Sequence, residues 1–524
     1  MQLPLRQNSL ERLRALRTVD VLIIGGGING AGLLRELALN GVDALLVDKS
    51  DFAAGATSAS SRMIHGGLRY MENGEFRLVR ESLRERNRLL KNAPHAVKPL
   101  PTTIPIFSRW SGFANVFSGS FGNSPRPAPR GKALIKAGLM LYDLFAGSDN
   151  VLPHHYLTSR ESALKIRPSL NPDVLCTATY FDAWVALPER LCIELIDDAI
   201  AVHPGSLALN YISLEGVVTQ GEIILRDVLT AEKFTVRPQV VVNATGAWID
   251  LANNALGENT RYIGGTKGSH LIIDHPELFA ATGDGQVFYE NAEGRICIFF
   301  RLHGKVLVGS TDIRVDNPEI EACDDGEIAY ILESVRIVFP AISVGREHVV
   351  AHFCGVRPLP ASDARLTGRI SRSHICRSLL SDAVHPWPIH AMIGGKWTTF
   401  RAFAAQVADK IFIQLNLHRR VSSEAIPIGG RSPEPDYSSL NALASIAATE
   451  AVVHLDDLLL RRTPLALYGR LSLERFGAIS ACVSRVLGWN DAHLADERVR
   501  TSTLLATRHG VTLALSDQTQ PLHP

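Results

Sequence analysis

Residues 58–70 combine a high density of hydrogen-bond donors that could bind an anionic group. The run SASSRMIHGGLRY holds three serines, one histidine, two glycines and an Arg-Tyr pair. The guanidinium fork of arginine fits the oxygens of a phosphate, and serine hydroxyls can donate to them without adding charge. A loop that only joins two elements seldom needs so many donors. We therefore interpret this segment as part of a binding site.

Three glycines near the N-terminus have the spacing of a dinucleotide site. Gly25, Gly27 and Gly30 form G-x-G-x-x-G after a short apolar run, and Asp48 closes the next apolar run. The first glycine allows a tight turn, the second lets the backbone approach a pyrophosphate, and the third lets the helix pack on the strand. Asp48 can accept hydrogen bonds from the adenosine ribose. The motif predicts a dinucleotide, without deciding between NAD and FAD.

Two later segments favour FAD. The apolar run VVVNATGAW ends in Ala244, Thr245 and Gly246, which suits a second close approach of backbone to the same cofactor. An ordinary strand followed by a turn is the alternative for this segment. GGKWTTFR places Gly394 and Gly395 before a helix, whose N-terminus could stabilise negative charge on a reduced flavin.

The predicted elements place these motifs at the ends of strands. Residues 20–24 and 43–49 are apolar runs typical of buried strands, and LLRELALN between them has helical spacing, with Gly41 as its C-cap. A further helix is predicted over 188–202, with Pro188 in its first turn. We expect the β-rich segments that follow to form an antiparallel or mixed second sheet. They are SLALNYI, EIILRDV, FTVRPQVVVNATGAW, GSHLIID, RICIFFRL and KVLVGSTDI.

Composition limits the classes of function. The 524 residues are 46% hydrophobic, enough for a large core, and 54 Lys and Arg against 53 Asp and Glu argue against nucleic-acid binding. The 7 scattered cysteines predict free thiols in a reducing compartment, and no His/Cys/Asp/Glu cluster has the spacing of a metal site. The N-terminus lacks the apolar core of a signal peptide and no spanning segment occurs. We expect a cytoplasmic protein, or one resting on a membrane.

We expect three regions along the chain. Residues 1–17 form a basic N-terminal segment, and residues 18–415 form a body with the dinucleotide-binding unit and a substrate cap. Residues 416–524 begin polar and rich in Pro and Ser and then become mainly helical, which predicts a small separate domain. Within the body, residues 108–147 mix aromatics, Gly and Pro with only basic charges until Asp143.

Together these motifs resemble those of one family, the FAD-dependent (aerobic, quinone-linked) glycerol-3-phosphate dehydrogenases. The segments that carry the resemblance are IGGGINGAG, TSASSRMIHGGLRYMENGEFRLVRESLRER, NATGAW, GGTKGSH, GVRPL, SRSH and GGKWTTFR. HLDDLLLRRT, residues 454–463, is similar to the family's small C-terminal helical domain. The resemblance implies an α/β fold like that of glycine oxidase and D-amino-acid oxidase, with an FAD-binding Rossmann-type domain, a β-rich substrate cap and a C-terminal helical domain.

The resemblance also implies a substrate. The expected reaction is the oxidation of sn-glycerol 3-phosphate to dihydroxyacetone phosphate by hydride transfer to flavin N5. Arg69 and Tyr70 would help to hold the phosphate, and Arg372 of SRSH would add a second phosphate contact. Because the segment before SRSH is shorter than is usual in the family, Arg369 is the alternative to Arg372.

The expected FAD site draws on several segments. Serine and threonine hydroxyls of residues 56–61 would meet the pyrophosphate, and Gly66 and Gly67 would leave room for a ring. The full set expected at the cofactor is Gly25, Gly27, Gly30, Asp48, Thr57, Ser58, Ser60, Ser61, His65, Gly66, Gly67, Ala244, Thr245, Gly246, Gly395, Lys396 and Thr398.

Oxidising an alcohol requires a base beside the flavin. Histidine, with an unperturbed pKa near 6.5, suits the removal of the hydroxyl proton while a hydride leaves the carbon. His270 of KGSH matches the family's substrate-side histidine, and His65 is a competing candidate. Arg357 of GVRPL would stabilise the developing alkoxide, and Lys396 of GGK would favour the reduced, anionic flavin.

The electrons must then leave the flavin. The family passes them to a membrane quinone, which predicts peripheral contact with the inner face of the cytoplasmic membrane. Residues 108–147 are the predicted lipid contact, with RLRALR near the N-terminus as an addition; a surface loop and a cap helix are the alternative. The side chains expected at lipid are Trp110, Phe113, Phe117, Phe121, Arg126, Arg130, Lys132 and Lys136. Some relatives reduce oxygen instead, and a homo-oligomer is compatible with the sequence.

Three alternatives stay open. The substrate could be another polyol phosphate, such as erythritol phosphate, which the same phosphate contacts would bind. An amine or amino-acid oxidase of the same fold would instead need an arginine for a carboxylate. A flavin-binding sensor without turnover would not need His270, Arg357 and Lys396 together.

Overall fold

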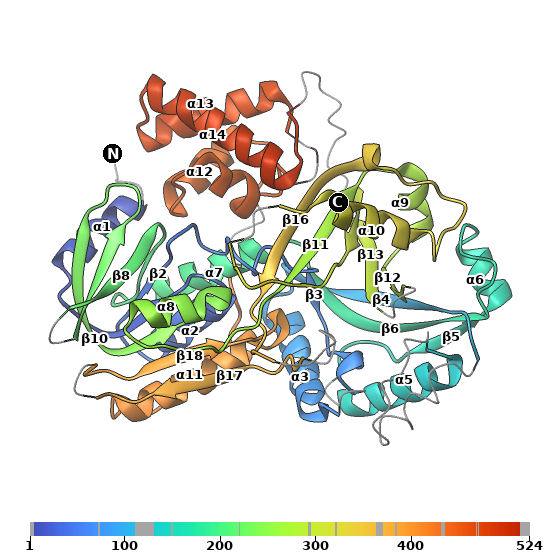
Figure 1. The fold of residues 1–524 in the computed structure, drawn as a ribbon, viewed down its shortest axis with the longest axis horizontal. Coiled ribbons are helices and arrows are strands. Elements are labelled where there is room, and N and C mark those ends of the chain that lie inside the picture. The colour runs from blue at the N-terminus through green and yellow to red at the C-terminus, as the bar shows by residue number, and fades with distance from the viewer. Residues whose placement is uncertain are drawn as a thin grey trace.

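The computed structural model contains two mixed β-sheets covered by helices (Figure 1). The residues it describes are 5–71, 74–109, 130–147, 150–218, 221–291, 295–319, 322–362, 370–382, 385–430, 435–467, 469 and 471–513. Arg369 lies outside these ranges. So do five residues of the predicted lipid contact, which are Trp110, Phe113, Phe117, Phe121 and Arg126. Among the described residues, no helix is long and apolar enough to cross a membrane.

The first sheet has a parallel centre. Its strands are β1 (Thr18–Ile24), β2 (Ala44–Val47), β7 (Leu207–Leu209), β8 (Ile212–Val218), β9 (Glu222–Asp227), β10 (Lys233–Asn243), β17 (Ile375–Leu379) and β18 (Ile389–Ile393). The main order is β17-β18-β10-β1-β2-β7, in which β1 runs parallel to both β10 and β2. The last four residues of β1 and all of β2 are buried, as strands covered on both faces require.

Helices cover both faces of this sheet. Helix α2 (Ile28–Leu39) packs against α7 (Pro188–Val202) and α11 (Phe400–Gln414). On the other face α1 (Leu5–Ala15) buries Leu10 and Leu13 in the same apolar cluster as residues of β1. The strand–turn–helix–strand unit predicted from residues 20–49 is therefore present. Gly41 follows α2 with a φ of +75°, as the predicted cap requires.

The second sheet lies beside the first and has ten strands in the order β15-β11-β14-β13-β12-β4-β6-β3, with β16 paired to β11 and β5 to β6. Its strands are β3 (Met63–Ile64), β4 (Val97–Ile106), β5 (Tyr156–Ser159), β6 (Cys176–Val185), β11 (Thr266–Ile273), β12 (Gln286–Glu290), β13 (Ile296–Leu302), β14 (Lys305–Gly309), β15 (Ile313–Arg314) and β16 (Val349–Arg357). The remaining helices of the body are α3 (Phe76–Asn92), α5 (Lys132–Ala146), α6 (Arg160–Ile166), α8 (Ile249–Ala255), α9 (Pro276–Thr282) and α10 (Asp325–Val335).

The prediction that the β-rich segments together form a second sheet is wrong for the first three of them. Residues 207–243 form β7 to β10 of the first sheet, and only the strands from Thr266 onward join the second. The second sheet also takes β4 and β6 from earlier in the chain. Strand β10 pairs antiparallel with β9 through its first half and parallel with β1 through its second half. Such pairing depends on distant partners, which local periodicity does not reveal.

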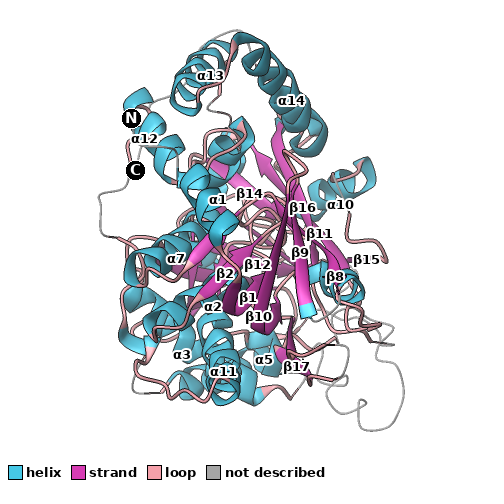
Figure 2. Cartoon of the chain, turned by 90° about the vertical axis from the view of Figure 1, so that its left-hand side faces the viewer, coloured by secondary structure: helices cyan, strands magenta, loops and turns pink. Residues whose placement is uncertain are grey.

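The C-terminal helices lie above both sheets in Figure 1, and Figure 2 shows α13 and α14 at the end of the molecule opposite α11. They are α12 (Leu440–Thr449), the π-helix η9 (Asp457–Arg462), α13 (Leu473–Leu487) and α14 (Asp491–His509). Leu443, Leu459 and Phe476 share one apolar cluster with Phe300 and Phe353 of the second sheet. The predicted division near residue 416 thus stays a prediction, and the helices pack onto the body through a common core.

Candidate cofactor and substrate site

Two cavities adjoin at the carboxyl ends of β1, β10 and β18. The larger has a volume of about 750 Å³ and the smaller about 230 Å³. The residues that line both are Ala56, Ala59, Pro358, Gly394, Gly395, Lys396 and Trp397. Ligands of α/β sheets bind at the carboxyl ends of parallel strands, so the position of both cavities suits a bound cofactor and its substrate.

The glycine-rich loop forms one wall of the larger cavity. Gly25 has a φ of +110°, and a Cβ on it would lie 2.6 Å from the carbonyl oxygen of Ala244. A Cβ on Gly30 would lie 1.9 Å from the carbonyl oxygen of Gly25. Gly27 lines the cavity, and Thr57 Oγ1 accepts a hydrogen bond from the backbone N–H of Ile28 at 3.0 Å. The loop therefore needs glycine for its own close contacts and leaves its backbone facing the cavity.

Asp48 lies at the same cavity and also holds the loop. Its carboxylate accepts hydrogen bonds from the backbone N–H of Gly26 at 2.7 Å and of Ser50 at 2.8 Å. Burial raises the pKa of Asp48 to about 6, against the effect of these two donors. Asp48 can thus accept from a ribose hydroxyl while it fixes the conformation of the turn.

Most of the residues expected at FAD line one of the two cavities. The larger cavity is lined by Gly25, Gly27, Asp48, Thr57, Ser58, Ala244, Thr245, Gly246, Gly395 and Lys396. The smaller is lined by Ser60, Ser61, His65, Gly395, Lys396 and Thr398. His65 is fixed by Thr398, whose Oγ1 accepts from its backbone N–H at 3.0 Å and donates to its carbonyl oxygen at 3.2 Å.

Gly66 and Gly67 line neither cavity. The aromatic rings beside these two glycines are tyrosine side chains of the protein itself. A Cβ on Gly66 would lie 2.3 Å from the hydroxyl oxygen of Tyr142, and one on Gly67 would lie 2.1 Å from the ring of Tyr70. The space that we expected for a ligand ring is therefore filled by two tyrosines. Gly30 lines neither of these two cavities, because it packs against the loop.

The larger cavity fits a dinucleotide. Its volume lies within the range of small-molecule sites, about 300–1,000 Å³. Asn29 at its wall donates to the carbonyl oxygen of Gly394 at 3.0 Å, while its buried Oδ1 has no hydrogen-bond partner within the described residues. The bare backbone of the glycine-rich loop, the Asp48 carboxylate at the cavity wall and this unpaired acceptor together match the needs of a bound FAD.

The smaller cavity gathers the residues predicted to carry the chemistry. It is lined by Tyr70, His270, Arg357, Arg372 and Lys396. Arg69 does not line it; this residue lies on the 3₁₀ turn η1 (Leu68–Met71) next to Tyr70. Four of the five lining residues come from segments more than a hundred positions from Tyr70 in the sequence, so only the fold brings them together.

His270 is 1% exposed and held on two sides. Its Nε2 lies 2.8 Å from Ser61 Oγ, and its ring stacks on Phe353 with 5.1 Å between ring centroids. Burial, and then the charges of Arg357 and Arg62, lower the pKa of His270 to about 3. The expectation of a pKa near 6.5 is therefore wrong for this fold, and His270 is neutral at pH 7. Its Nδ1 is buried without a hydrogen-bond partner in the part of the chain that the structure describes.

One carboxylate that the sequence analysis missed holds two of the cations. Asp312 Oδ1 lies 3.2 Å from Arg357 Nη1, and Asp312 Oδ2 lies 3.9 Å from Arg372 Nη2. Ser310 Oγ accepts from Arg357 Nη2 at 3.0 Å. A Cβ on Gly268 would lie 2.0 Å from that same nitrogen, so this glycine gives the guanidinium its place. No local pattern in GSTDI marks Asp312 as a site residue.

Lys396 stands between the two cavities. Its Nζ donates to Ser82 Oγ at 2.6 Å and lies 4.5 Å from the centroid of the Tyr70 ring. Burial lowers the pKa of Lys396 to about 7. Burial, followed by the charges of Lys396 and Arg372, also lowers the pKa of His65 to about 3. Both imidazoles at the small cavity are thus neutral near pH 7.

The larger cavity has a wall that the sequence analysis did not predict. Residues of η9, of the turn after it and of α14 face the same space as the glycine-rich loop. These residues are Asp456, Leu460, Arg461, Leu467, Arg500, Leu504, Arg508 and His509. The clustered charges within the apolar run HLDDLLLRRT are the one local signal that could have indicated their involvement.

The fold also brings together a group that the sequence spacing did not suggest. Ligand atoms of Glu258, Asp382 and His385 lie within 4.8 Å of one another. None of the three lines either cavity, so we assign them no part in the candidate site.

Comparison with known proteins identifies the fold and the relatives. The FAD dependent oxidoreductase model matches residues 20–401. A glycerol-3-phosphate dehydrogenase from Synechocystis sp. is 38% identical over 76% of this chain and 70% of its own length. The structure of a glycerol-3-phosphate dehydrogenase from Bacillus halodurans complexed with FAD superposes with a TM-score of 0.73 at 19% identity, covering 98% of this chain and 99% of that chain. A glycine oxidase from Geobacillus kaustophilus superposes with a TM-score of 0.50 at 16% identity, covering 80% and 100%.

Proposed function

Because the chain belongs to the FAD-dependent oxidoreductases, and within them to the glycerol-3-phosphate dehydrogenases, we propose that it oxidises sn-glycerol 3-phosphate to dihydroxyacetone phosphate. The observation that carries this proposal is the smaller cavity, where His270 and the cations Arg357, Arg372 and Lys396 face one space beside the cofactor cavity. FAD supplies the acceptor for the hydride when it is bound. Gly25, Gly27, Asp48 and the other lining residues described above would hold it.

The cations account for the phosphate. A phosphate monoester carries nearly two negative charges, and guanidinium groups match its oxygens in pairs. Asp312 holds Arg357 and Arg372 at one edge of the cavity, and Lys396 lies on the cofactor side. A volume of about 230 Å³ suits a short polyol phosphate. Arg69 remains a predicted phosphate contact that would act from outside this lining.

His270 is the proposed base. Its neutral ring can accept the hydroxyl proton at Nε2, directly or through the hydroxyl of Ser61 at 2.8 Å. A dianion in the cavity would raise the pKa of His270, because an opposite charge nearby favours the protonated imidazole. The substrate itself would therefore strengthen the base that deprotonates it. Arg357 is close enough to His270 for its charge to lower the pKa of the imidazole. The same charge would stabilise the alkoxide as the proton leaves.

The test of this function is reduction of the flavin by substrate. Anaerobic addition of sn-glycerol 3-phosphate to the holoenzyme should bleach the flavin absorbance at roughly 450 nm, because a reduced flavin loses this absorbance. Glycerol and inorganic phosphate, added separately, should leave it unchanged. Failure of every phosphorylated polyol in a panel to bleach the flavin would overturn the proposal.

We further propose that the electrons pass to a quinone at a membrane surface. Helix α5 supports this, because Lys136, Met140 and Leu144 recur at every fourth position and all three are exposed, Met140 by 57% and Leu144 by 73%. An apolar and basic stripe of this kind suits anionic lipid. The arginines of RLRALR contribute less, since Arg12 donates to the carbonyl oxygen of Pro204 and Arg14 pairs with Glu232.

A further inference from the structure

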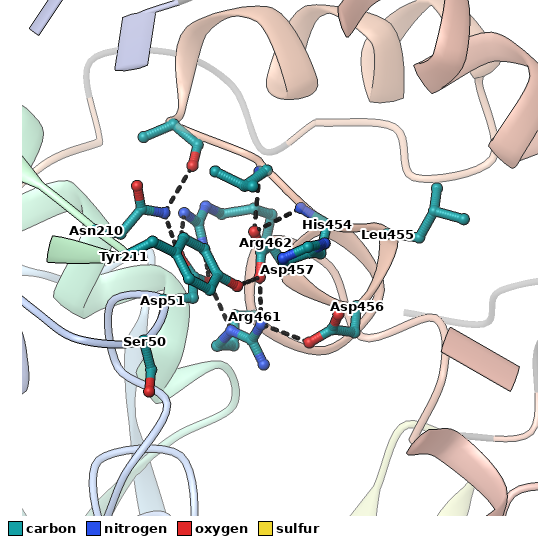
Figure 3. Close-up of polar contacts among 12 residues, drawn as sticks. Ser50, Asp51, Asn210, Tyr211, His454, Leu455, Asp456, Asp457, Arg461 and Arg462 are labelled. Atoms are coloured by element: carbon teal, nitrogen blue, oxygen red, sulfur yellow. Dashed lines mark hydrogen bonds and ion pairs between the residues drawn. The ribbon is translucent and has the colours of Figure 1, made fainter. Parts of the chain in front are cut away.

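The turn that follows Asp48 is fastened to the C-terminal helical region. The Asp51 carboxylate is 1% exposed and accepts from Arg462 Nη1 at 2.6 Å and from Arg462 Nη2 at 2.9 Å. Arg461 Nε donates to it at 2.5 Å and Asn210 Nδ2 at 2.8 Å. Figure 3 shows both arginines directed at Asp51 from η9. Burial opposes the charge of Asp51, but the two arginines hold its pKa below the usual value, so the carboxylate stays ionised.

The same turn supports the cofactor side of the molecule. Asp48 accepts from the backbone N–H of Gly26 at 2.7 Å, and the backbone N–H of Ala53 donates to the carbonyl oxygen of Gly26 at 3.0 Å. The ring of Phe52 lies only 2.5 Å from where a Cβ on Gly26 would be. The glycine-rich loop is thus held by Asp48 and by two residues of this turn, Phe52 and Ala53. Asp51 lies between Asp48 and Phe52 in the sequence and does not itself line the larger cavity.

The arginines are themselves fixed within the helical region and by the first sheet. Arg461 Nη2 donates to Asp457 Oδ1 at 2.5 Å, and the Tyr211 hydroxyl donates to the same oxygen at 2.6 Å (Figure 3). Arg462 Nε and Nη2 donate to the carbonyl oxygen of Glu450 at 3.1 and 2.9 Å. Because each guanidinium has several fixed partners, neither can follow Asp51 if the turn moves.

A second observation leads to the same place. Eight residues of the helical region, from Asp456 to His509, line the same larger cavity as the glycine-rich loop. The FAD dependent oxidoreductase model ends at residue 401, so this wall is added by a region outside the domain shared across the family. The buried hydrogen bonds to Asp51 and the shared cavity wall are separate features, and both connect the helical region to the cofactor.

We propose that the C-terminal helical region is part of the FAD site. Arg461 and Arg462 are positioning residues, which hold through Asp51 the turn that presents Asp48 to the adenosine ribose. Helices η9 and α14 close the larger cavity around the cofactor. Binding of FAD and docking of the helical region then stabilise each other, because each favours the arrangement that the other needs. This proposal depends on FAD binding and not on the identity of the substrate.

The rate of FAD release from the holoenzyme tests the proposal. The variant is the double substitution Asp51→Asn with Arg462→Met, which removes the Asp51–Arg462 pair from both sides. Arg461 keeps Asp456 and Asp457 as partners, so no buried charge is left unpaired. Free FAD is more fluorescent than bound FAD, so release is followed by fluorescence at a temperature where circular dichroism shows the fold intact. We expect release about 10- to 100-fold faster than in the wild type, the range typical of residues that orient a ligand's contacts.

The matched control is Arg498→Met. Arg498 donates to Ser480 Oγ at 2.7 Å and to the carbonyl oxygen of Gly477 at 3.1 Å, contacts that lie within the helical region and away from both cavities. Its release rate should equal that of the wild type. A folded double variant that also releases FAD at the wild-type rate would overturn the proposal.

Amide hydrogen exchange on the wild-type chain decides the matter if the double variant does not fold. Exchange in residues 456–467 and 500–509 should be slower with saturating FAD than after removal of FAD, because the bound cofactor disfavours local opening. Unchanged exchange in both segments would refute the proposal. A holoenzyme that shows this protection but does not oxidise glycerol 3-phosphate would refute only the proposed function.

Discussion

The imidazole of His270 and the ammonium of Lys396 line one small cavity, yet burial gives them different charge states near neutral pH. The pKa of His270 is lowered to about 3, so the ring is neutral at pH 7 and can accept a proton. The pKa of Lys396 is lowered to about 7, so at that pH roughly half of the protein molecules carry a charged Lys396. The site thus combines a proton acceptor with a cation that responds to pH.

His270→Asn should lower kcat by about 10²- to 10⁴-fold, the usual contribution of a general base, and should leave the FAD content unchanged. Anaerobic stopped-flow measurement of flavin reduction separates this step from reoxidation. His390→Gln is the control, because His390 is equally buried at 1% and lines neither cavity. Flavin reduction at the wild-type rate in His270→Asn would assign the proton to another group.

The KM for glycerol 3-phosphate should rise as the pH rises through about 7, because deprotonation of Lys396 removes a positive charge that the phosphate needs. Below that pH the Lys396 ammonium is fully charged, so its titration should no longer change KM as the pH falls. Lys396→Arg keeps its charge throughout, so its KM should not rise over the same pH range. Identical pH profiles for the two proteins would show that Lys396 does not bind the phosphate.

At the scale of elements, glycines on the antiparallel strands β11 and β14 leave space for the catalytic side chains of β11 and β16. Gly268 on β11 leaves space for the Arg357 guanidinium of β16. Gly309 at the end of β14 does the same for His270, since a Cβ there would lie 2.3 Å from the imidazole Cδ2. Cross-strand neighbours on one face of a sheet stand close enough for such fits to matter.

Gly268→Ala should therefore lower kcat/KM by about 10- to 100-fold without unfolding the protein. The added Cβ would lie 2.0 Å from Arg357 Nη2 and would displace the guanidinium from Ser310 and Asp312, whereas the backbone at this position accepts alanine. Gly477→Ala is the control, because a Cβ there meets nothing within 4 Å. Steady-state kinetics together with melting temperatures would check the outcome, and unchanged kcat/KM would contradict it.

At the scale of the whole molecule, the two sheets and the C-terminal helices each supply one part of the site. The first sheet provides the dinucleotide loop, the second provides His270 and Arg357, and the helical region lines part of the larger cavity. One apolar cluster joins the second sheet to those helices, so the parts cannot separate without exposing buried Leu and Phe side chains. Helix α5, which carries the proposed membrane contact, lies at the side of the molecule opposite the C-terminal helices in Figure 1.

The double variant Met140→Ser with Leu144→Ser should bind vesicles of anionic lipid about tenfold or more weakly than the wild type, because it removes two apolar side chains from the proposed contact. Co-sedimentation with vesicles measures the difference. Leu380→Ser is the matched control, since Leu380 is 78% exposed and lies far along the chain, after β17. Equal binding by wild type and double variant would remove α5 from the proposed membrane contact.

The amino-acid sequence by itself determined the dinucleotide unit and the identity of most candidate residues. Gly25, Gly27 and Gly30 with the strands around them are readable because a strand, a tight turn and a helix are set by neighbouring residues and backbone sterics. The resemblance then supplied His270, Arg357 and Lys396 from short motifs, and the structure places all three at one cavity.

Only the tertiary structure decided the sheet to which each strand belongs, the pairing of Asp312 with two arginines, and the pKa of His270. It also placed Arg461 and Arg462 beside the turn that follows Asp48, some four hundred positions earlier in the chain. These properties depend on burial and on contacts between distant segments. A local pattern carries no information about either, because desolvation and electrostatic neighbours exist only once the chain has folded.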